Sequence, residues 1–134
     1  MIVVVTKKRF LSILRKIASK ETSSTPSRWV PKNPLLGHCA VASLLAQDLF
    51  GGVLLRASLH PYPAFREARS HYWNRFSDGS EYDFTKEQFG RRFSQGPGMK
   101  GEIKEREYLL SFPETERRYV LLRERFFSYC EKLS

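Results

Sequence analysis

A β-hairpin is the element that the sequence predicts most strongly, and its register decides which side chains can meet. Residues 69–76 and 80–85 are rich in aromatic side chains, which favour strands, and they flank Ser77-Asp78-Gly79, a sequence typical of a tight turn. A two-residue turn would place Asn74 opposite Asp83. A three-residue loop, with its glycine in the left-handed region, shifts the pairing by one residue.

We expect the three-residue loop, because it places Arg75 directly opposite Glu81, and these side chains carry opposite charges. In this register the facing pairs are Phe76 with Ser80, Arg75 with Glu81, Trp73 with Asp83 and His71 with Thr85. His71 and Asp83 then become diagonal neighbours on one face of the sheet, within reach of a hydrogen bond.

Residues 39–50 show a second strong pattern, that of a buried helix. Apolar side chains recur there at helical spacing, and Gly51-Gly52 ends the pattern. A short strand is expected over residues 53–59, and a last helix from Pro113 to about residue 132. Together these elements predict an α+β fold. The helix that begins at Cys39 packs on a small antiparallel sheet, with further helices at both ends of the chain.

The N-terminal segment is strongly basic, whereas the rest of the chain is nearly balanced. Residues 1–32 hold eight Lys and Arg against one acidic residue, and residues 33–134 hold fifteen against thirteen. Apolar residues between 10 and 17 recur at helical spacing, which predicts a helix docked on the core; a helix on a membrane surface is the alternative. We divide the chain into a basic N-terminal helix or arm, residues 1–20, and a single α+β domain, residues 21–134. The uneven charge argues against a nucleic-acid-binding role for the whole domain.

The cysteines and the apolar segments of the sequence indicate the cellular compartment in which the protein is expected. Cys39 and Cys130 match neither a disulfide framework nor a paired zinc-binding motif. The N-terminal apolar run is short and precedes its basic residues, which is the reverse of a secretory signal. No apolar run approaches the roughly 20 residues needed to span a bilayer. We therefore expect a cytoplasmic protein that does not enter a membrane.

The position of Cys39 at a helix start favours thiol chemistry. Partial positive charge and free amide groups at a helix N-terminus stabilise a thiolate, and the same amides can face an oxyanion. A nucleophilic cysteine also needs a base, and the base needs a group that orients it. His71 is the candidate base and Asp83 the candidate orienting carboxylate. Each residue also has an ordinary structural interpretation: a buried thiol, a strand histidine and a carboxylate that caps the turn at Thr85.

Three further side chains are candidates for such a site. Asn33 lies six residues before Cys39 and His38 lies next to it, so either could donate a hydrogen bond to an oxyanion. Trp73, on the same predicted strand as His71, could contact a substrate. Asn33 could equally be an ordinary turn residue.

Several segments resemble the YunG family of small bacterial proteins. They are Gly37-His38-Cys39-Ala40-Val41-Ala42, Gln47-Asp48-Leu49-Phe50-Gly51-Gly52, Ser70-His71-Tyr72-Trp73-Asn74-Arg75 and Asp78-Gly79-Ser80-Glu81-Tyr82-Asp83-Phe84-Thr85. The resemblance extends from about Glu21 to Arg125. In the family pattern Gln commonly occupies the position of His38, where its amide would be an obvious oxyanion donor. The resemblance implies no established activity.

A looser resemblance, to the papain-like cysteine hydrolase superfamily, rests on the order of the candidate residues. Cys39 opens a helix, His71 follows on a strand and Asp83 on the next strand, and Asn33 is similar in position to an amide-bearing residue of that superfamily. Ala40-Val41 depart from the papain pattern, which has an aromatic residue after the nucleophile. The resemblance implies a papain-like core and a Cys-His-Asp thiol hydrolase or acyltransferase, although a fold alone does not fix a function.

The sequence therefore favours a thiol-dependent hydrolase or acyltransferase. Its expected partner is a small amide, peptide or isopeptide substrate, and no cofactor or metal is expected. The alternative is a non-catalytic binding module whose aromatic residues, Tyr72, Trp73 and Tyr82, join the basic arm in contacting a protein or, less favoured, a nucleic acid. A third interpretation is a zinc site formed by Cys39, His71 and Asp83, or by His38, Cys39 and His60, but the spacing matches no known zinc motif.

Two remaining features are expected to be peripheral. Residues 90–101 are rich in glycine and predict a flexible loop that could cover a site. The adjacent arginines Arg117-Arg118 are expected to form a solvated pair.

Overall fold

A computed structural model describes residues 4–63, 69–90 and 99–133. Its elements in chain order are α1 (Lys7–Ile17), η1 (Lys20–Thr22), α2 (Cys39–Phe50), β1 (Val53–Ser58), β2 (Ser70–Arg75), β3 (Glu81–Tyr82), η3 (Lys86–Phe89), β4 (Glu102–Lys104), α4 (Arg106–Leu110) and α5 (Pro113–Leu133). Residues 91–98, the centre of the predicted glycine-rich loop, lie outside the described residues. Among the described helices, none combines the length and apolar character that a membrane span requires.

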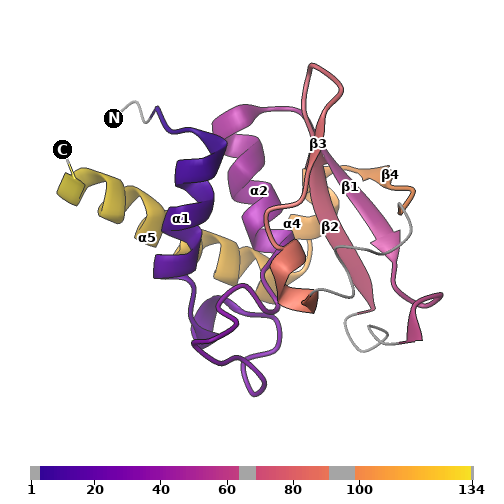
Figure 1. Ribbon diagram of the computed structural model, residues 1–134, viewed down its shortest axis with the longest axis horizontal. Helices are drawn as coiled ribbons and strands as arrows, with labels where there is room; N and C mark the ends of the chain where they lie inside the picture. The colour runs from indigo at the N-terminus through magenta and orange to yellow at the C-terminus, as the bar shows by residue number, and fades with distance from the viewer. Residues whose placement is uncertain (1–3, 64–68, 91–98, 134) are drawn as a thin grey trace.

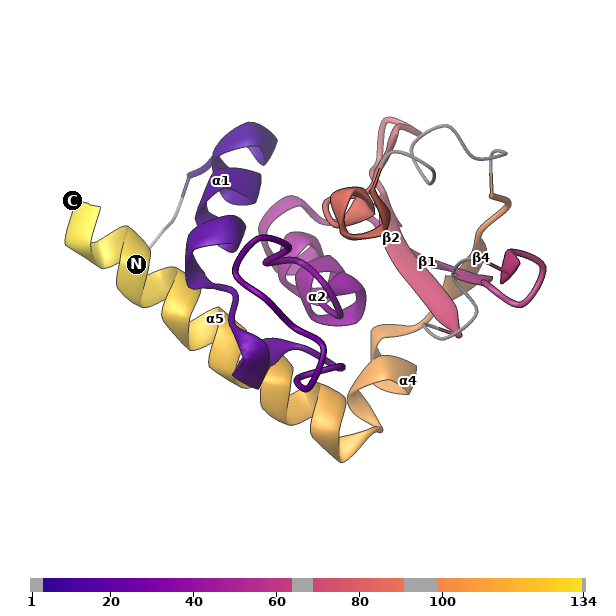
Figure 2. The same cartoon turned by 60° about the horizontal axis from the view of Figure 1, so that its bottom comes forward.

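Helix α2 lies at the centre of the molecule, with the sheet on one side and α1 and α5 on the other (Figures 1 and 2). Six consecutive residues of α2, 41–46, are buried. A helix covered on both sides must be apolar around most of its circumference, and this explains why its apolar residues extend beyond a single stripe. The predicted α+β architecture, with a buried helix on a small antiparallel sheet and helices at both ends, is confirmed.

The four strands are antiparallel and lie in the order β3-β2-β1-β4. In the hairpin Arg75 pairs with Glu81, and the Phe76 amide donates to the Ser80 carbonyl over 2.8 Å. Gly79 has φ +86°, in the left-handed region. The three-residue loop and its register are therefore confirmed. Strand β3 covers only two residues and is shorter than expected, so Asp83 lies just beyond its end.

Helix α1 is part of the same core as the rest of the fold. Its buried residues Phe10, Ile13 and Leu14 belong to the hydrophobic cluster that also contains residues of α2 and α5. The Phe10 ring meets the edge or face of Phe84 at 4.9 Å and of Phe126 at 5.6 Å between centroids. The expectation of a terminal helix docked on the core is confirmed.

Two adjacent glycines after α2 differ in their surroundings and provide a test of the packing. Both have positive φ, +75° at Gly51 and +80° at Gly52. A Cβ at Gly51 would meet nothing within 4 Å, whereas one at Gly52 would lie 2.2 Å from the carbonyl oxygen of Arg75. The backbone of Gly52 therefore passes directly against the end of β2.

We expect Gly52→Ala to lower the free energy of unfolding far more than Gly51→Ala. Gly51→Ala adds only the strain of a backbone conformation, φ 75° and ψ -154°, that is essentially restricted to glycine, about 1–3 kcal/mol. Gly52→Ala adds a clash with backbone that cannot rotate away, and should cost at least about 2 kcal/mol more. Urea denaturation of the two variants measures the difference. Equal losses would show that this contact is absent.

Candidate active site

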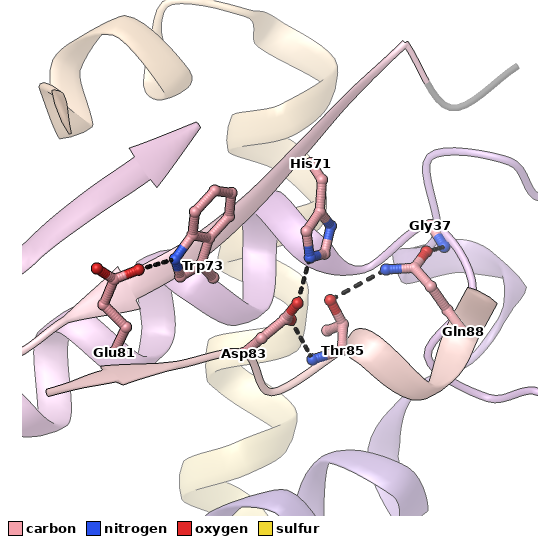
Figure 3. A network of polar contacts seen from close by, with 7 residues as sticks. All are labelled: Gly37, His71, Trp73, Glu81, Asp83, Thr85 and Gln88. Atoms are coloured by element: carbon pink, nitrogen blue, oxygen red, sulfur yellow. Dashed lines mark hydrogen bonds and ion pairs between the residues drawn. The ribbon is translucent and has the colours of Figure 1, made fainter. Parts of the chain in front are cut away.

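The candidate base and carboxylate meet as the hairpin register predicts. His71 projects from β2, and its Nε2–H donates to Oδ2 of Asp83 over 2.5 Å (Figure 3). The other carboxylate oxygen of Asp83 accepts from the Thr85 amide over 3.1 Å. Both oxygens of Asp83 are thus held, which fixes the orientation of the carboxylate toward the imidazole.

Cys39, the first residue of α2, is one of the residues that affect the pKa of His71. Burial is the largest influence on the His71 pKa and lowers it, but hydrogen bonds with Asp83 and with the Cys39 side chain, together with their charges, raise the pKa to about 9. Because Nε2 of His71 is bound to Asp83, Nδ1 is the ring nitrogen that can face the thiol. The ring is therefore a cation at neutral pH, and a neighbouring cation stabilises a thiolate.

The imidazole of His71 is fully buried and held between aromatic rings. Trp73 lies nearly parallel to it at 5.8 Å between centroids, and Phe89 meets it edge-on at 5.1 Å. Trp73 is itself buried, and its indole N–H donates to Oε1 of Glu81 over 2.7 Å. Trp73, expected as a substrate contact, therefore lies against the candidate base, and its polar atom is bound to the neighbouring strand.

The N-terminus of α2 carries no side chain that caps it. The N-cap residue, His38, makes no side-chain capping bond, and the first turn contains no acidic residue. The first amide groups of a helix have no partner within the helix. The amide of Cys39 is therefore suited to hold a negative charge that forms next to the thiol.

The two expected oxyanion donors instead hold the loop before α2. His38 is buried, with Nε2 2.7 Å from Oγ1 of Thr22 and Nδ1 2.9 Å from the Leu36 carbonyl oxygen. Burial is the main cause that lowers the pKa of His38 to about 4, so the ring is neutral. The Nδ2 of Asn33 donates to the Gln88 carbonyl over 3.0 Å. These contacts engage both ring nitrogens of His38 and one N–H of the Asn33 amide, and the oxyanion roles expected for the two residues stay predictions.

A chain of hydrogen bonds links the carboxylate to the cysteine loop. Beyond Asp83, Oγ1 of Thr85 accepts from Nε2 of Gln88 over 3.0 Å, and Oε1 of Gln88 accepts from the Gly37 amide over 3.0 Å (Figure 3). The side chain of Thr85 does not cap the backbone of η3 and binds the side-chain amide of Gln88. Gln88 was not foreseen as part of the site, and it joins the segment carrying Asp83 to the turn before Cys39.

Gly37 makes the turn before Cys39 possible. It has φ +78°, and a Cβ there would lie 2.3 Å from Oγ of Ser23.

Among the residues that the structure describes, no group of three or more His, Cys, Asp or Glu side chains is arranged to hold a metal ion. The groups that the structure brings together at this site are a thiol, an imidazolium and a carboxylate.

Comparison with known proteins identifies the family. The family model for the YunG protein matches residues 6–131. A protein of Bacillus subtilis (strain 168), described as the uncharacterized protein YunG, is 30% identical over 122 residues, which cover 91% of this chain and 92% of that protein. No solved structure matches the chain. Since the family model spans nearly the whole sequence, the chain belongs to the YunG family.

Proposed function

We propose that this protein is a thiol-dependent hydrolase or acyltransferase that acts on an amide, peptide or isopeptide carbonyl. Cys39 would be the nucleophile, His71 the proton carrier and Asp83 the group that orients the imidazole. The observation that carries the proposal is the His71 ring, which is bound to the Asp83 carboxylate over 2.5 Å and whose pKa is raised by Asp83 and Cys39. A base held by a third group beside a nucleophile is the arrangement that covalent acyl transfer requires.

The proposed reaction has two halves. The Cys39 thiolate attacks the carbonyl carbon, a C–S bond forms, and the amine departs with the proton that His71 donates from Nδ1. Water, or an acceptor amine, then gives a proton to His71 and attacks the thioester, which breaks the C–S bond and restores the thiolate and imidazolium. During both halves the amide of Cys39 would stabilise the oxyanion. A papain-like core, with its order of cysteine helix, histidine strand and aspartate, is part of this proposal.

The binding-module alternative lacks a supporting observation. Of the aromatic side chains that it required, Trp73 is buried. Basic side chains of α1 already have partners within the fold: Arg15 pairs with Glu87, and Nζ of Lys16 donates to the Tyr129 hydroxyl. We therefore propose no second function.

Acylation by an activated ester tests the proposed function. With p-nitrophenyl acetate we expect a burst of p-nitrophenolate, one per chain, because acylation of the thiol precedes slower hydrolysis. The burst and the acetyl adduct in the intact mass should vanish in Cys39→Ala and persist in Cys130→Ala, which removes the other thiol. A burst that survives Cys39→Ala would refute the proposed function.

A further inference from the structure

The proposed nucleophile and its base come from different parts of the chain. His71 lies on β2 and Asp83 follows β3, whereas Cys39 follows the loop that precedes α2. Pairing between the two strands fixes the imidazole relative to the carboxylate, but it does not fix the thiol. Contacts between the segment that carries Asp83 and the loop before α2 therefore contribute to where the thiol lies.

Gln88 makes such contacts from a buried position on η3. Its side-chain Oε1 accepts from the amide of Gly37, two residues before Cys39, over 3.0 Å (Figure 3). Its backbone carbonyl accepts from Nδ2 of Asn33 over 3.0 Å. The loop before α2 is thus bound to Gln88 at two points.

The other end of the same side chain is bound to the segment that carries Asp83. Nε2 of Gln88 donates to Oγ1 of Thr85 over 3.0 Å, and the Thr85 backbone amide donates to Oδ1 of Asp83 over 3.1 Å. Phe89, the next residue of η3, packs edge-on against the His71 ring at 5.1 Å between centroids. Gln88 therefore connects the loop before α2 with the segment that holds both the imidazole and its carboxylate.

The orientation of the Gln88 amide follows from its partners. The backbone N–H of Gly37 can only donate, so the atom that faces it must be the oxygen, and the nitrogen then faces Thr85. Both ends of this buried amide are satisfied, which favours a single conformation of the side chain. The two contacts require one acceptor and one donor at the end of a long side chain, and glutamine supplies both.

We propose that Gln88 is a positioning residue: it holds the turn before Cys39 at a fixed distance from the segment of Asp83, so that the thiol stays aligned with the His71 imidazole. The inference rests on the proposed function and adds a residue that acts through the other three. Gln88 itself exchanges no proton. Alignment matters because the nucleophile and its base must stay within hydrogen-bond reach during acyl transfer.

Gln88→Met tests the proposal, because methionine is close to glutamine in length but has no amide to bind Gly37 and Thr85. We expect the burst rate with p-nitrophenyl acetate to fall by about 10- to 100-fold, since a small displacement of reacting groups has effects of that size. The matched control is Glu87→Gln, which breaks the ion pair of the exposed Glu87 with Arg15 on the adjacent position of η3. Its burst rate should stay within about twofold of the wild-type rate, because exposed ion pairs contribute little.

A second measurement distinguishes alignment of His71 from a general effect on the structure. Once the imidazole is replaced, as in His71→Gln, no base is left to align. Gln88→Met should then slow the acylation of Cys39, followed as the acetyl adduct in the intact mass, by less than about twofold further. A structural role alone would give the same fold loss with and without the imidazole.

The outcomes separate this inference from the function on which it rests. If acylation does not depend on Cys39, the proposed function fails and the inference fails with it. If Cys39→Ala abolishes acylation but Gln88→Met reacts as fast as Glu87→Gln, or is slowed by the same factor with and without the imidazole, only the inference is overturned.

If Gln88→Met fails to fold, as circular dichroism would show, Thr85→Val decides in the same two backgrounds. Valine keeps the shape of the threonine side chain and removes the oxygen that accepts from Gln88. We expect Thr85→Val to slow acylation in the presence of His71 and to have little further effect in His71→Gln. An unchanged burst rate in Thr85→Val would then overturn the inference.

Discussion

Replacing His71 by glutamine is expected to slow the acylation of Cys39 by about 100- to 10,000-fold, the range that a positioned acid–base group contributes. Glutamine is close in size and can still donate to Asp83, but it cannot exchange a proton with the thiol or the leaving group. The aromatic rings of Trp73 and Phe89 that hold the imidazole remain in place. The measurement is the burst rate with p-nitrophenyl acetate at fixed pH.

The matched control for this change is His60→Gln. His60 is exposed and lies beyond the end of β1, so the substitution removes an imidazole that the proposed mechanism does not use. We expect its burst rate to stay within about twofold of the wild-type rate, as for most surface changes. A His71→Gln protein that folds and acylates as fast as the His60→Gln protein would remove His71 from the mechanism.

The two cysteines of the chain should differ strongly in their reaction with iodoacetamide. Cys130, on α5, has its pKa raised by burial, so it is a neutral thiol at pH 6.5. Cys39 lies beside a cationic imidazole and at a helix N-terminus, both of which favour the reactive thiolate. We expect Cys39 to be alkylated at least about 10-fold faster than Cys130, because the thiolate is the form that reacts and both neighbours of Cys39 stabilise it.

Peptide mass spectrometry over a time course reports both rates in one sample, so Cys130 is an internal control for the concentration of reagent. In His71→Gln the rate at Cys39 should fall toward that of an ordinary thiol, while the rate at Cys130 should not change. Alkylation of Cys39 and Cys130 at similar rates in the native protein would show that Cys39 is not activated.

The parts of the site that could be predicted from the sequence depend on local chemistry. The turn Ser77-Asp78-Gly79 needs a left-handed residue at its last position, and the charge pair across the hairpin selects one register, so the meeting of His71 with Asp83 follows from neighbours in sequence. The helix that starts at Cys39 and stops at a glycine is likewise a local pattern.

Residues that bridge distant segments could not be predicted in the same way. The partner of Asn33 is the carbonyl of Gln88, and His38 is bound by Thr22, contacts between segments that only tertiary packing brings together. Arg118 on α5 is half-buried, which contradicts the solvated pair expected of Arg117-Arg118, because tertiary packing decides which side of a helix becomes covered. No sequence motif marks these contacts.

Strand β4 and helix α4 could not be predicted because both are short. Strand β4 has the sequence Glu102-Ile103-Lys104 and forms by pairing with β1, and α4 contributes one buried side chain, Leu109. Elements of three to five residues have too few apolar positions to show a period.

The most direct test of the Cys39–His71–Asp83 arrangement is an NMR titration of the His71 imidazole in the full chain. Because hydrogen bonds with Asp83 and Cys39 raise the pKa of His71 to about 9, the ring should keep its proton through neutral pH and lose it as the pH rises through 9. In Cys39→Ala and in Asp83→Asn that midpoint should move to lower pH, since each change removes one stabilising partner while burial still opposes the charge. A midpoint near the ordinary 6.5, unchanged in both variants, would contradict the arrangement and the function proposed from it.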